Sequence, residues 1–446
     1  MKYVRGALAG MAGIVVSVMA GPENPADLTG DLAVNAMTSI RFGQIVEGKY
    51  KGIDFRRQWM HQGIGNITAV RRFGDNFTIT VGLEAKMWYN TVPLENPQTT
   101  YNPKTQFPKQ NYSVYISHGE GVRRFDFGRD IRLRLGIGLV PYKYNPEVRN
   151  LGEYLFRTEA YPVYLEGEID RPFARISGFR AGLRLWDRWD QELLVTTETS
   201  RLPFHDFSLT YITHADLLDG VLQPGAGVQA HRLISVDERF TQPKIEANAY
   251  LDEDGDTAYY TARATKVMGR LTIDFRPLVG ADLLGEEEFK LYTEACVLGV
   301  KDYPSNTAIS EFDTTNEFGY DKLLEKLPVM VGFSFPTFKA LDVLAVEAQW
   351  LGTKYPNSNQ SMIEETGPLP YKPNSQADYT KEDYTKDDWK WTAYARKSIG
   401  KHFSLTGLAA RDHIRVNTIY NQELDFEEAL TRDSHWYWAL KCAFQF

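Results

Sequence analysis

Apolar and polar residues alternate over long stretches of this chain, with the two-residue period of a β-strand. In residues 77–89 every odd position is apolar or aromatic, and most even positions are Thr, Gly, Glu or Lys. Successive side chains of a strand point to opposite faces, so this stretch has one apolar and one polar face. A typical soluble strand has roughly 5–6 residues, whereas about ten tilted residues cross a bilayer. The pattern therefore predicts long strands, and residues 131–139 and 179–185 repeat it.

The last eleven residues, 436–446, alternate in the same way. Their apolar positions are Trp436, Trp438, Leu440, Cys442, Phe444 and Phe446. A final strand that ends on an aromatic residue resembles the closing strand of bacterial outer-membrane β-barrels, and the resemblance is to porin-like barrels as a class. It implies that Trp436, Trp438, Leu440, Phe444 and Phe446 serve assembly in the membrane. It places Cys442 on the lipid face, and Lys441 and Gln445 inside.

The beginning of the chain predicts export. Lys2 and Arg5 precede an apolar run over residues 7–18, and Val18-Met19-Ala20 resembles a signal-peptidase site. The run is too short to span a bilayer. The expected organisation is a signal peptide at residues 1–20, a short polar leader at residues 21–33 and a transmembrane β-barrel at residues 34–446.

Alternation and turn residues together predict an all-β fold with about eighteen strands, or sixteen if one hairpin is removed. The assignment includes strands at residues 163–169, 245–251 and 258–265, and treats residues 215–241 as a loop. Connections are short at 73–76, 252–256, 336–340 and 398–401, and long at 90–110, 215–241, 302–326, 353–388 and 416–433. Short turns on one side and long loops on the other are typical of a membrane-spanning, antiparallel up-and-down barrel with periplasmic turns and extracellular loops. A soluble β-sandwich or propeller also alternates, but the export signal, long strands and loop asymmetry favour the barrel.

Composition agrees with this architecture. The mean hydropathy is −0.38, which suits a barrel with a polar lumen and polar loops, and aromatic residues make up 13% of the chain, which suits interfacial girdles. The net charge of −8 disfavours nucleic-acid binding. Cys296 and Cys442 fall on opposite faces of their predicted strands, so we expect no disulfide.

Inward-facing charges are the candidate functional residues. We expect Arg132 and Arg134 on one strand, Glu166 and Glu168 on the next, and Arg180 and Arg184 on a third. This solute-pathway set is Arg132, Arg134, Glu166, Glu168, Arg180 and Arg184. It either creates a field that orients or selects solutes, or forms cross-strand salt bridges that stiffen the wall.

Other candidate sites are weaker. Asp252, Asp254 and Asp256 alternate around a glycine as in calcium loops, but lack the glutamate that completes one, and Asp-Gly also favours a plain hairpin turn. Residues 90–110 are the first candidate for a loop that folds into the pore. We find no metal-ligand spacing among the histidines and no nucleophile elbow, so we expect neither catalysis nor a cofactor.

The resulting hypothesis is an outer-membrane porin that lets small hydrophilic solutes diffuse passively. The alternative is a surface adhesin or carbohydrate-binding barrel that acts through its long loops. Expected partners are outer-membrane lipid and lipopolysaccharide, the barrel-assembly machinery and small polar solutes, with a homotrimer left open. The expected location is the outer membrane of a Gram-negative-type bacterium.

Overall fold

The computed structural model describes residues 32–50, 53–74, 76–88, 92–93, 111–128, 130–156, 174–198, 207–234, 249–251, 257–259, 263–300, 322–353, 369, 388–412, 415–420, 423–428 and 434–446. These residues form a closed β-barrel, a two-stranded sheet and a three-stranded sheet.

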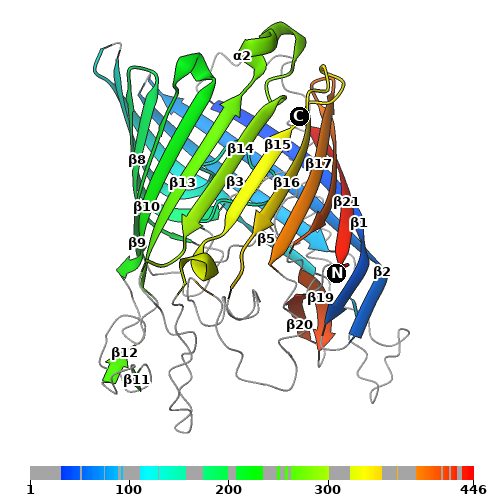
Figure 1. Ribbon diagram of the computed structural model, residues 1–446. Coiled ribbons are helices and arrows are strands. Elements are labelled where there is room, and N and C mark those ends of the chain that lie inside the picture. Colours follow the sequence, from blue (N-terminus) through cyan, green and yellow to red (C-terminus); the bar gives the residue numbers. More distant parts are fainter. Residues whose placement is uncertain are drawn as a thin grey trace.

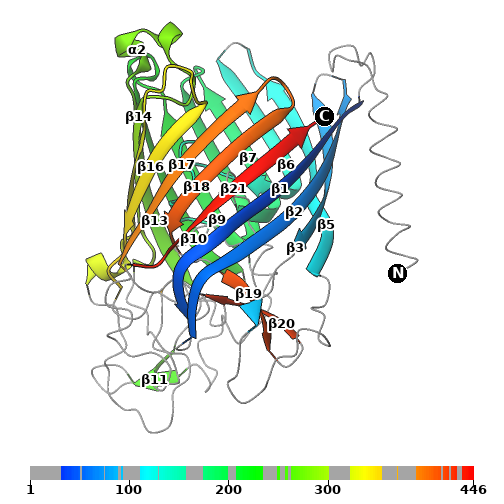
Figure 2. The same cartoon turned by 90° about the vertical axis from the view of Figure 1, so that its right-hand side faces the viewer.

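Sixteen strands close the barrel (Figure 1). Around the ring they are β1 (Leu32–Tyr50), β2 (Ile53–Phe73), β3 (Phe77–Trp88), β5 (Asn111–Asp126), β6 (Ile131–Tyr142), β7 (Ala174–Leu185), β8 (Trp189–Glu198), β9 (Phe207–Ala215), β10 (Leu222–Ile234), β13 (Ala264–Asp274), β14 (Lys290–Val297), β15 (Val329–Ser334), β16 (Val343–Trp350), β17 (Trp389–Ile399), β18 (Phe403–Arg411) and β21 (Trp436–Gln445). Neighbouring strands are antiparallel, and β21 pairs with β1 to close the ring (Figure 2). The up-and-down barrel predicted from the sequence is confirmed.

Period-two alternation sets the two faces of the wall. In β3, Val81 and Leu83 are each 47% exposed on the outside, whereas Glu84 and Lys86, at the next even positions, are buried inside. In β21, Tyr437, Ala439 and Lys441 are buried inside, so Trp436, Trp438 and Leu440 face outward as predicted. Cys442 is also outward and Cys296 is buried, and both are free thiols. The barrel is thus apolar outside and largely polar inside.

Both described ends of the chain lie at one end of the barrel. The N–H of Phe446 donates to the carbonyl of Ala36 at 2.8 Å, and the N–H of Ala36 returns a bond to Phe446 at 3.3 Å. Strands are joined here by short turns, including the predicted turns at 73–76, 336–340 and 398–401. We call this the short-turn end. The long connections 89–110, 143–173, 235–263, 298–328, 351–388 and 412–435 leave from the opposite, long-loop end.

The count of sixteen is the lower of the two predicted counts. Residues 163–169 lie outside the described residues, and β6 pairs directly with β7, so no strand separates them. Residues 249–251 and 257–259 form strands β11 (Ala249–Leu251) and β12 (Thr257–Tyr259) of a separate hairpin rather than barrel strands. The prediction also missed β10, because Pro224, Gly225 and Gly227 interrupt its alternation.

Few other elements accompany the barrel among the described residues. Strands β19 (Arg415–Tyr420), β20 (Glu423–Glu428) and β4 (Val92–Pro93) form the three-stranded sheet. Short helices are α2 (Arg276–Val279), η2 (Leu218–Gly220), η5 (Ala281–Leu283) and η6 (Leu323–Lys326). No helix in the described part of the chain is long and apolar enough to cross a membrane.

Glu288 joins two connections at the short-turn end. Its carboxylate accepts the N–H groups of Thr337, Phe338 and Lys339 at 2.8–2.9 Å. Phe338 and Lys339 have positive φ angles of 55° and 64°, which bulky residues rarely adopt. Burial acts to raise the pKa of Glu288, but the N–H bonds from Lys339 and Thr337 outweigh it and hold the pKa below its usual value. The ionised carboxylate therefore stabilises the strained β15–β16 turn.

We predict that Glu288→Gln lowers the free energy of unfolding by about 1–3 kcal/mol at neutral pH, because the charged hydrogen bonds are lost. A lowered pKa contributes stability only above the unfolded-state value, so the difference from wild type should shrink as the pH falls below about 4. Urea unfolding at several pH values measures it. The neighbouring, exposed Glu286→Gln is the matched control, and equal midpoints for the two variants would contradict the prediction.

Candidate functional site in the barrel lumen

One segment, residues 143–156, leaves the wall after β6 and crosses the lumen. It makes hydrogen bonds to β14, β16 and β17. In a ring of sixteen strands, β16 is eight positions from β6 and therefore diametrically opposite. We call residues 143–156 the lumen segment. It spans the barrel interior and narrows any passage through it.

Apolar side chains hold the lumen segment inside the barrel. Val148, Leu151, Tyr154, Leu155 and Phe156 are at most 1% exposed. They share one cluster with inward-facing residues of five strands, Ile176, Leu194, Ile212, Met268 and Met330. These wall residues would otherwise meet the lumen, so removing them from water favours the inserted segment.

Glu347 of β16 is the central polar contact of the lumen segment. It accepts three successive backbone N–H groups, those of Arg149, Asn150 and Leu151, the last two at 2.9 Å. The hydroxyl of Tyr292 donates to the same carboxylate at 3.0 Å. An irregular segment inside a barrel has backbone groups without strand partners, and the carboxylate satisfies three of them.

Glu294 of β14 and Lys266 of β13 bind the segment's two ends. Glu294 accepts the Tyr144 hydroxyl at 2.5 Å, the Asn145 amide at 2.8 Å and the Tyr154 N–H at 3.0 Å. The Lys266 ammonium donates to the carbonyls of Tyr154 and Leu155 at 3.2 and 3.0 Å. Buried charges on this wall are therefore matched by backbone and side-chain groups of the segment rather than by bulk water.

Two ion pairs connect the lumen segment to the short-turn end. Glu147 binds Lys290 at 2.9 Å, and Arg149 binds Glu287 at 3.2 Å. Glu287 also contacts Arg396 at 3.1 Å. The segment is thus fixed to the wall at its middle and toward the short-turn end.

Of residues 90–110, predicted to enter the pore, the structure describes only Val92–Pro93, which form β4 beside β19; the rest lie outside the described residues. The segment that does enter is 143–156. Its sequence signal is a group of large apolar residues without period two, close to Asn145, Pro146 and Asn150, which suits neither a strand nor a solvated loop.

Charged residues cover the wall formed by β5–β9. One row, in register from β5 to β9, is Asp126, Arg132, Arg184, Asp190 and His214. The next row is Arg124, Arg134, Gly182, Glu192 and Ile212. Arginine therefore lies directly opposite arginine twice, in an arrangement that is unfavourable unless other charges or water offset it.

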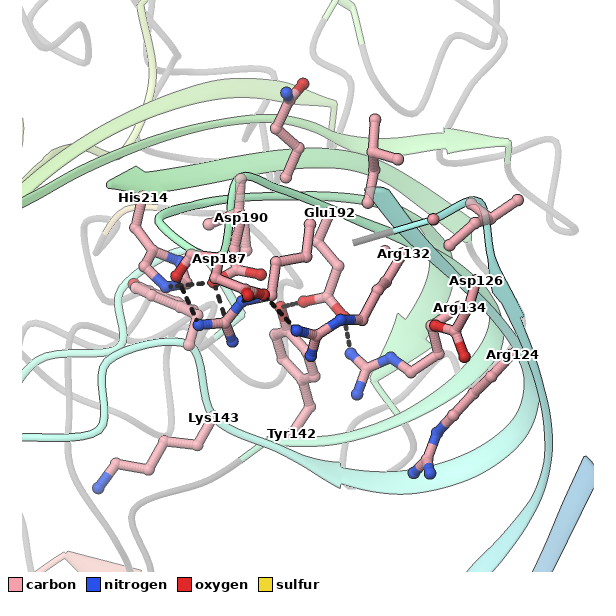
Figure 3. Close-up of a pocket in the computed structure, with 18 residues that line it drawn as sticks. Arg124, Asp126, Arg132, Arg134, Tyr142, Lys143, Asp187, Asp190, Glu192 and His214 are labelled. Carbon is pink, nitrogen blue, oxygen red and sulfur yellow. Dashed lines mark hydrogen bonds and ion pairs between the residues drawn. The ribbon is translucent and has the colours of Figure 1, made fainter. Parts of the chain in front are cut away.

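Carboxylates from β8 and the β7–β8 turn offset most of these arginines (Figure 3). Arg132 binds Asp187, and Arg134 binds Glu192 at 2.6 Å. Asp190 lies 3.7 Å from Arg184 and 3.1 Å from His214. Among the described residues, Arg124 makes no ion pair.

Glycines leave the space that these pairs need. Gly182 stands between Arg134 and Glu192 in the row, and an added Cβ would contact the Arg134 guanidinium at 3.6 Å. Gly136 of β6 lies between Arg180 of β7 and Val122 of β5 in the sheet. Arg180 binds Glu120 across this glycine, and a Cβ added at Gly136 would lie 2.6 Å from the Glu120 carboxylate. Arginine side chains can therefore cross a strand to reach an acid.

These rows line a cavity of about 960 Å³ that runs from the short-turn end to the start of the lumen segment. Its walls carry four arginines and one lysine against four carboxylates. The side chains of Arg132 and Arg134 are 51% and 47% exposed, so both are open to solvent in the cavity. The lysine is Lys143, and burial together with the positive charge of Arg149 lowers its pKa to about 8.

The structure brings together only part of the predicted pathway set. Arg132, Arg134 and Arg184 line the cavity, and Arg180 lies next to it, bound to Glu120. The predicted acidic strand between the two arginine strands is wrong, because β6 pairs directly with β7. Glu166 and Glu168 lie outside the described residues.

The acids that serve this wall, Asp187, Asp190 and Glu192, were missed as members of the pathway set, as were Arg124, Asp126 and Lys143. The alternation of Asp190 and Glu192 around Gln191, and of Arg124 and Asp126 around Phe125, was the available signal. Asp252, Asp254 and Asp256 also lie outside the described residues. Within the described part, no group of three or more His, Cys, Asp or Glu residues is arranged to hold a metal.

Comparisons with known proteins agree with this architecture. No protein-family model matches the chain, and no curated protein sequence matches it. Solved structures do: OprB of Pseudomonas putida has a TM-score of 0.51 and 10% identity, with 94% of each chain covered. The fold is that of a porin-like barrel. The outer membrane channel DcaP of Acinetobacter baumannii also matches, with a TM-score of 0.45, 12% identity, and 96% of this chain and 100% of that chain covered. OmpF of Salmonella typhi matches with a TM-score of 0.46, 9% identity, and 94% and 98% covered. At these identities the likeness concerns the fold of the porin-like barrel alone.

We predict that Glu347→Gln loosens the lumen segment while the barrel stays folded. Loss of the charged acceptor should cost about 1–3 kcal/mol locally, which is a roughly 5- to 150-fold faster exchange of the Arg149–Leu151 amides. Hydrogen exchange with mass spectrometry measures this. Glu120→Gln, on the other wall and bound to Arg180, is the control. Unchanged protection at residues 149–151 in Glu347→Gln would refute the role of Glu347.

Proposed function

We propose that this protein is an outer-membrane channel through which small hydrophilic solutes diffuse passively. The observation that carries the proposal is the charged wall of β5–β9, whose arginines and carboxylates face an open cavity inside a porin-like barrel. Exposed charges of both signs keep a lumen hydrated, and a passage of this kind needs no catalytic group or cofactor.

The lumen segment supplies the constriction in this proposal. It spans the barrel from β6 to β16, so solutes pass between it and the remaining wall. The arginines of β5, β6 and β7, with Asp126 of β5 among them, lie on one side of the cavity, and the other three carboxylates, Asp187, Asp190 and Glu192, lie beside them on the β8 side. This separation of charge creates a transverse field that orients dipolar solutes.

The proposed setting follows from the two faces of the wall. The outward apolar face lies in outer-membrane lipid and lipopolysaccharide, the short-turn end faces the periplasm, and the long-loop end faces the exterior. The signal peptide at residues 1–20 directs export, and the terminal strand with Trp436, Trp438, Leu440, Phe444 and Phe446 is read by the barrel-assembly machinery. Association of three copies is part of the same proposal.

Purified protein added to a planar lipid bilayer should produce stepwise conductance increments. A hydrated lumen conducts salt ions whether or not it selects among solutes. Protein that inserts into the bilayer, verified by protease protection, but gives no increments would remove the channel proposal and leave the adhesin alternative.

Arg124→Gln should make the channel less selective for anions, by about twofold in permeability ratio, because a charge facing the cavity is lost. Arg124 makes no ion pair among the described residues, so the change leaves no carboxylate without its partner. Reversal potentials in a KCl gradient measure the ratio.

The matched control for Arg124→Gln is Arg123→Gln. Arg123 is the preceding residue of β5, on the other face of the strand, where its guanidinium lies 5.1 Å from the ring centre of Phe125. Equal reversal potentials for wild type and both variants would show that the arginine wall does not control permeation.

A further inference from the structure

The connection between β13 and β14 exposes a set of large apolar side chains at the short-turn end. Leu278, Val279 and Leu283 are 68%, 52% and 64% exposed, and Phe338 of the neighbouring β15–β16 turn is 69% exposed. We call these four residues the apolar platform. In Figure 2, α2 stands above the end of β14 at the edge of the barrel. A connection that faced only water would gain nothing from four such residues.

Polar contacts hold the apolar platform in its exposed position. Glu288 binds the backbone of residues 337–339, and the Lys339 ammonium donates to the Asp282 carbonyl at 2.6 Å. The Arg276 guanidinium binds both carboxylate oxygens of Asp274. The two connections are therefore fixed to each other and to the end of β13, with the apolar side chains left outside.

The platform continues a belt of phenylalanines on the outer wall. Ring centres are 5.1 Å apart for Phe275 and Phe289, 6.3 Å for Phe289 and Phe333, and 4.9 Å for Phe333 and Phe335. Phe275 directly precedes α2. Leu278 and Val279 follow Phe275 by three and four residues, and α2 stands above the strand ends in Figure 2, so its apolar side chains lie beyond the belt. The polar layer on each side of a bilayer is about 5–7 Å thick.

We propose that the apolar platform is a lipid-binding surface that inserts into the phospholipid headgroup layer of the periplasmic leaflet. The inference rests on the proposed membrane location of the barrel and adds a specific interfacial contact to it. In such a layer the apolar side chains reach the upper acyl region, as in interfacial helices.

Two lysines give the platform charge complementarity to phospholipid. Lys339 donates to the Asp282 carbonyl, and Lys397 donates to the Lys339 carbonyl at 2.8 Å. Both partners are uncharged, so these contacts leave the two positive charges available to lipid phosphates. Long lysine stems lie along apolar surface while their ammonium groups stay in the polar layer.

Site-specific fluorescence in vesicles of phosphatidylethanolamine and phosphatidylglycerol tests the proposal. Single cysteines replace Leu278, Leu283 or Glu286 in a Cys296→Ala, Cys442→Ala background and carry an environment-sensitive fluorophore. Leu278→Cys and Leu283→Cys report on the platform. Glu286→Cys is the matched control, because this residue is an exposed acid of the same connection. Val81→Cys on the outer face of β3 reports whether the barrel itself lies in lipid.

Labels at residues 278 and 283 should be quenched by lipids that carry a nitroxide on the headgroup. They should be protected from aqueous iodide about threefold relative to the label at residue 286. Equal iodide quenching at 278, 283 and 286, with Val81→Cys in lipid, would overturn the inference and leave the channel proposal standing. A label at residue 81 that remains in water would overturn the membrane location itself. Loss of lipid quenching when periplasmic extract is added would show that a protein covers the platform instead.

Discussion

Each strand of the barrel turns every second side chain into the lumen, and the charges among those side chains need a partner or water. Closing the sheet removes its edges, but it concentrates Lys266, Glu294, Glu347 and Lys390 in one interior, where all four are almost completely buried. An unpaired charge in such a place would cost several kcal/mol. The need to give each interior charge a hydrogen-bond partner, an ion-pair partner or water therefore determines how the rest of the molecule is arranged.

The two halves of the wall meet this demand in different ways. On β13–β18 the lumen segment supplies backbone N–H groups, carbonyls and hydroxyls, and Glu347 alone accepts three N–H groups. On β5–β9 the charges pair with one another and stay open to solvent in the cavity, as the 47% exposure of the Arg134 side chain shows. Removing the segment would take these partners away from the charges of the first wall, whereas on the second wall it would uncover apolar residues such as Ile176 and Leu194 but leave the ion pairs in place. The asymmetry explains why one wall is a structural support and the other is the candidate solute pathway.

Local patterns made most of the barrel predictable, whereas non-local contacts did not. Alternation in β3 and β21 predicted the outward and inward faces of the wall and identified the closing strand. Turn residues at 73–76 and 398–401 predicted where consecutive strands reverse direction. The barrel has sixteen strands, the lower predicted count, rather than eighteen, because residues 249–251 and 257–259 form the separate β11–β12 hairpin and β6 pairs directly with β7. The lumen segment could not be predicted, since its contacts with Glu294 and Glu347 span 140–198 residues of sequence. The partner acids of the arginines were missed for a related reason: pairing depends on register, and the prediction placed a strand between β6 and β7, which pair directly.

The inward glycines connect these observations. A glycine in a row leaves space above its strand, so a long side chain from a neighbouring strand can cross it. Gly182 of β7 lets Arg134 of β6 reach Glu192 of β8, and so decides which acid this arginine binds. The same absence of a side chain makes room for the lumen segment: an added Cβ at Gly227 of β10 would lie 2.6 Å from Leu155. Gly227 is also one of the residues that hide β10 from sequence analysis. A wall built only from alternating large residues would be easier to recognise, but it would have no space at Gly227 for Leu155 and no path over Gly182 for the Arg134–Glu192 pair. The irregularities of the pattern therefore mark the places where this barrel departs from a uniform pore, and both the constriction and the charged wall depend on them.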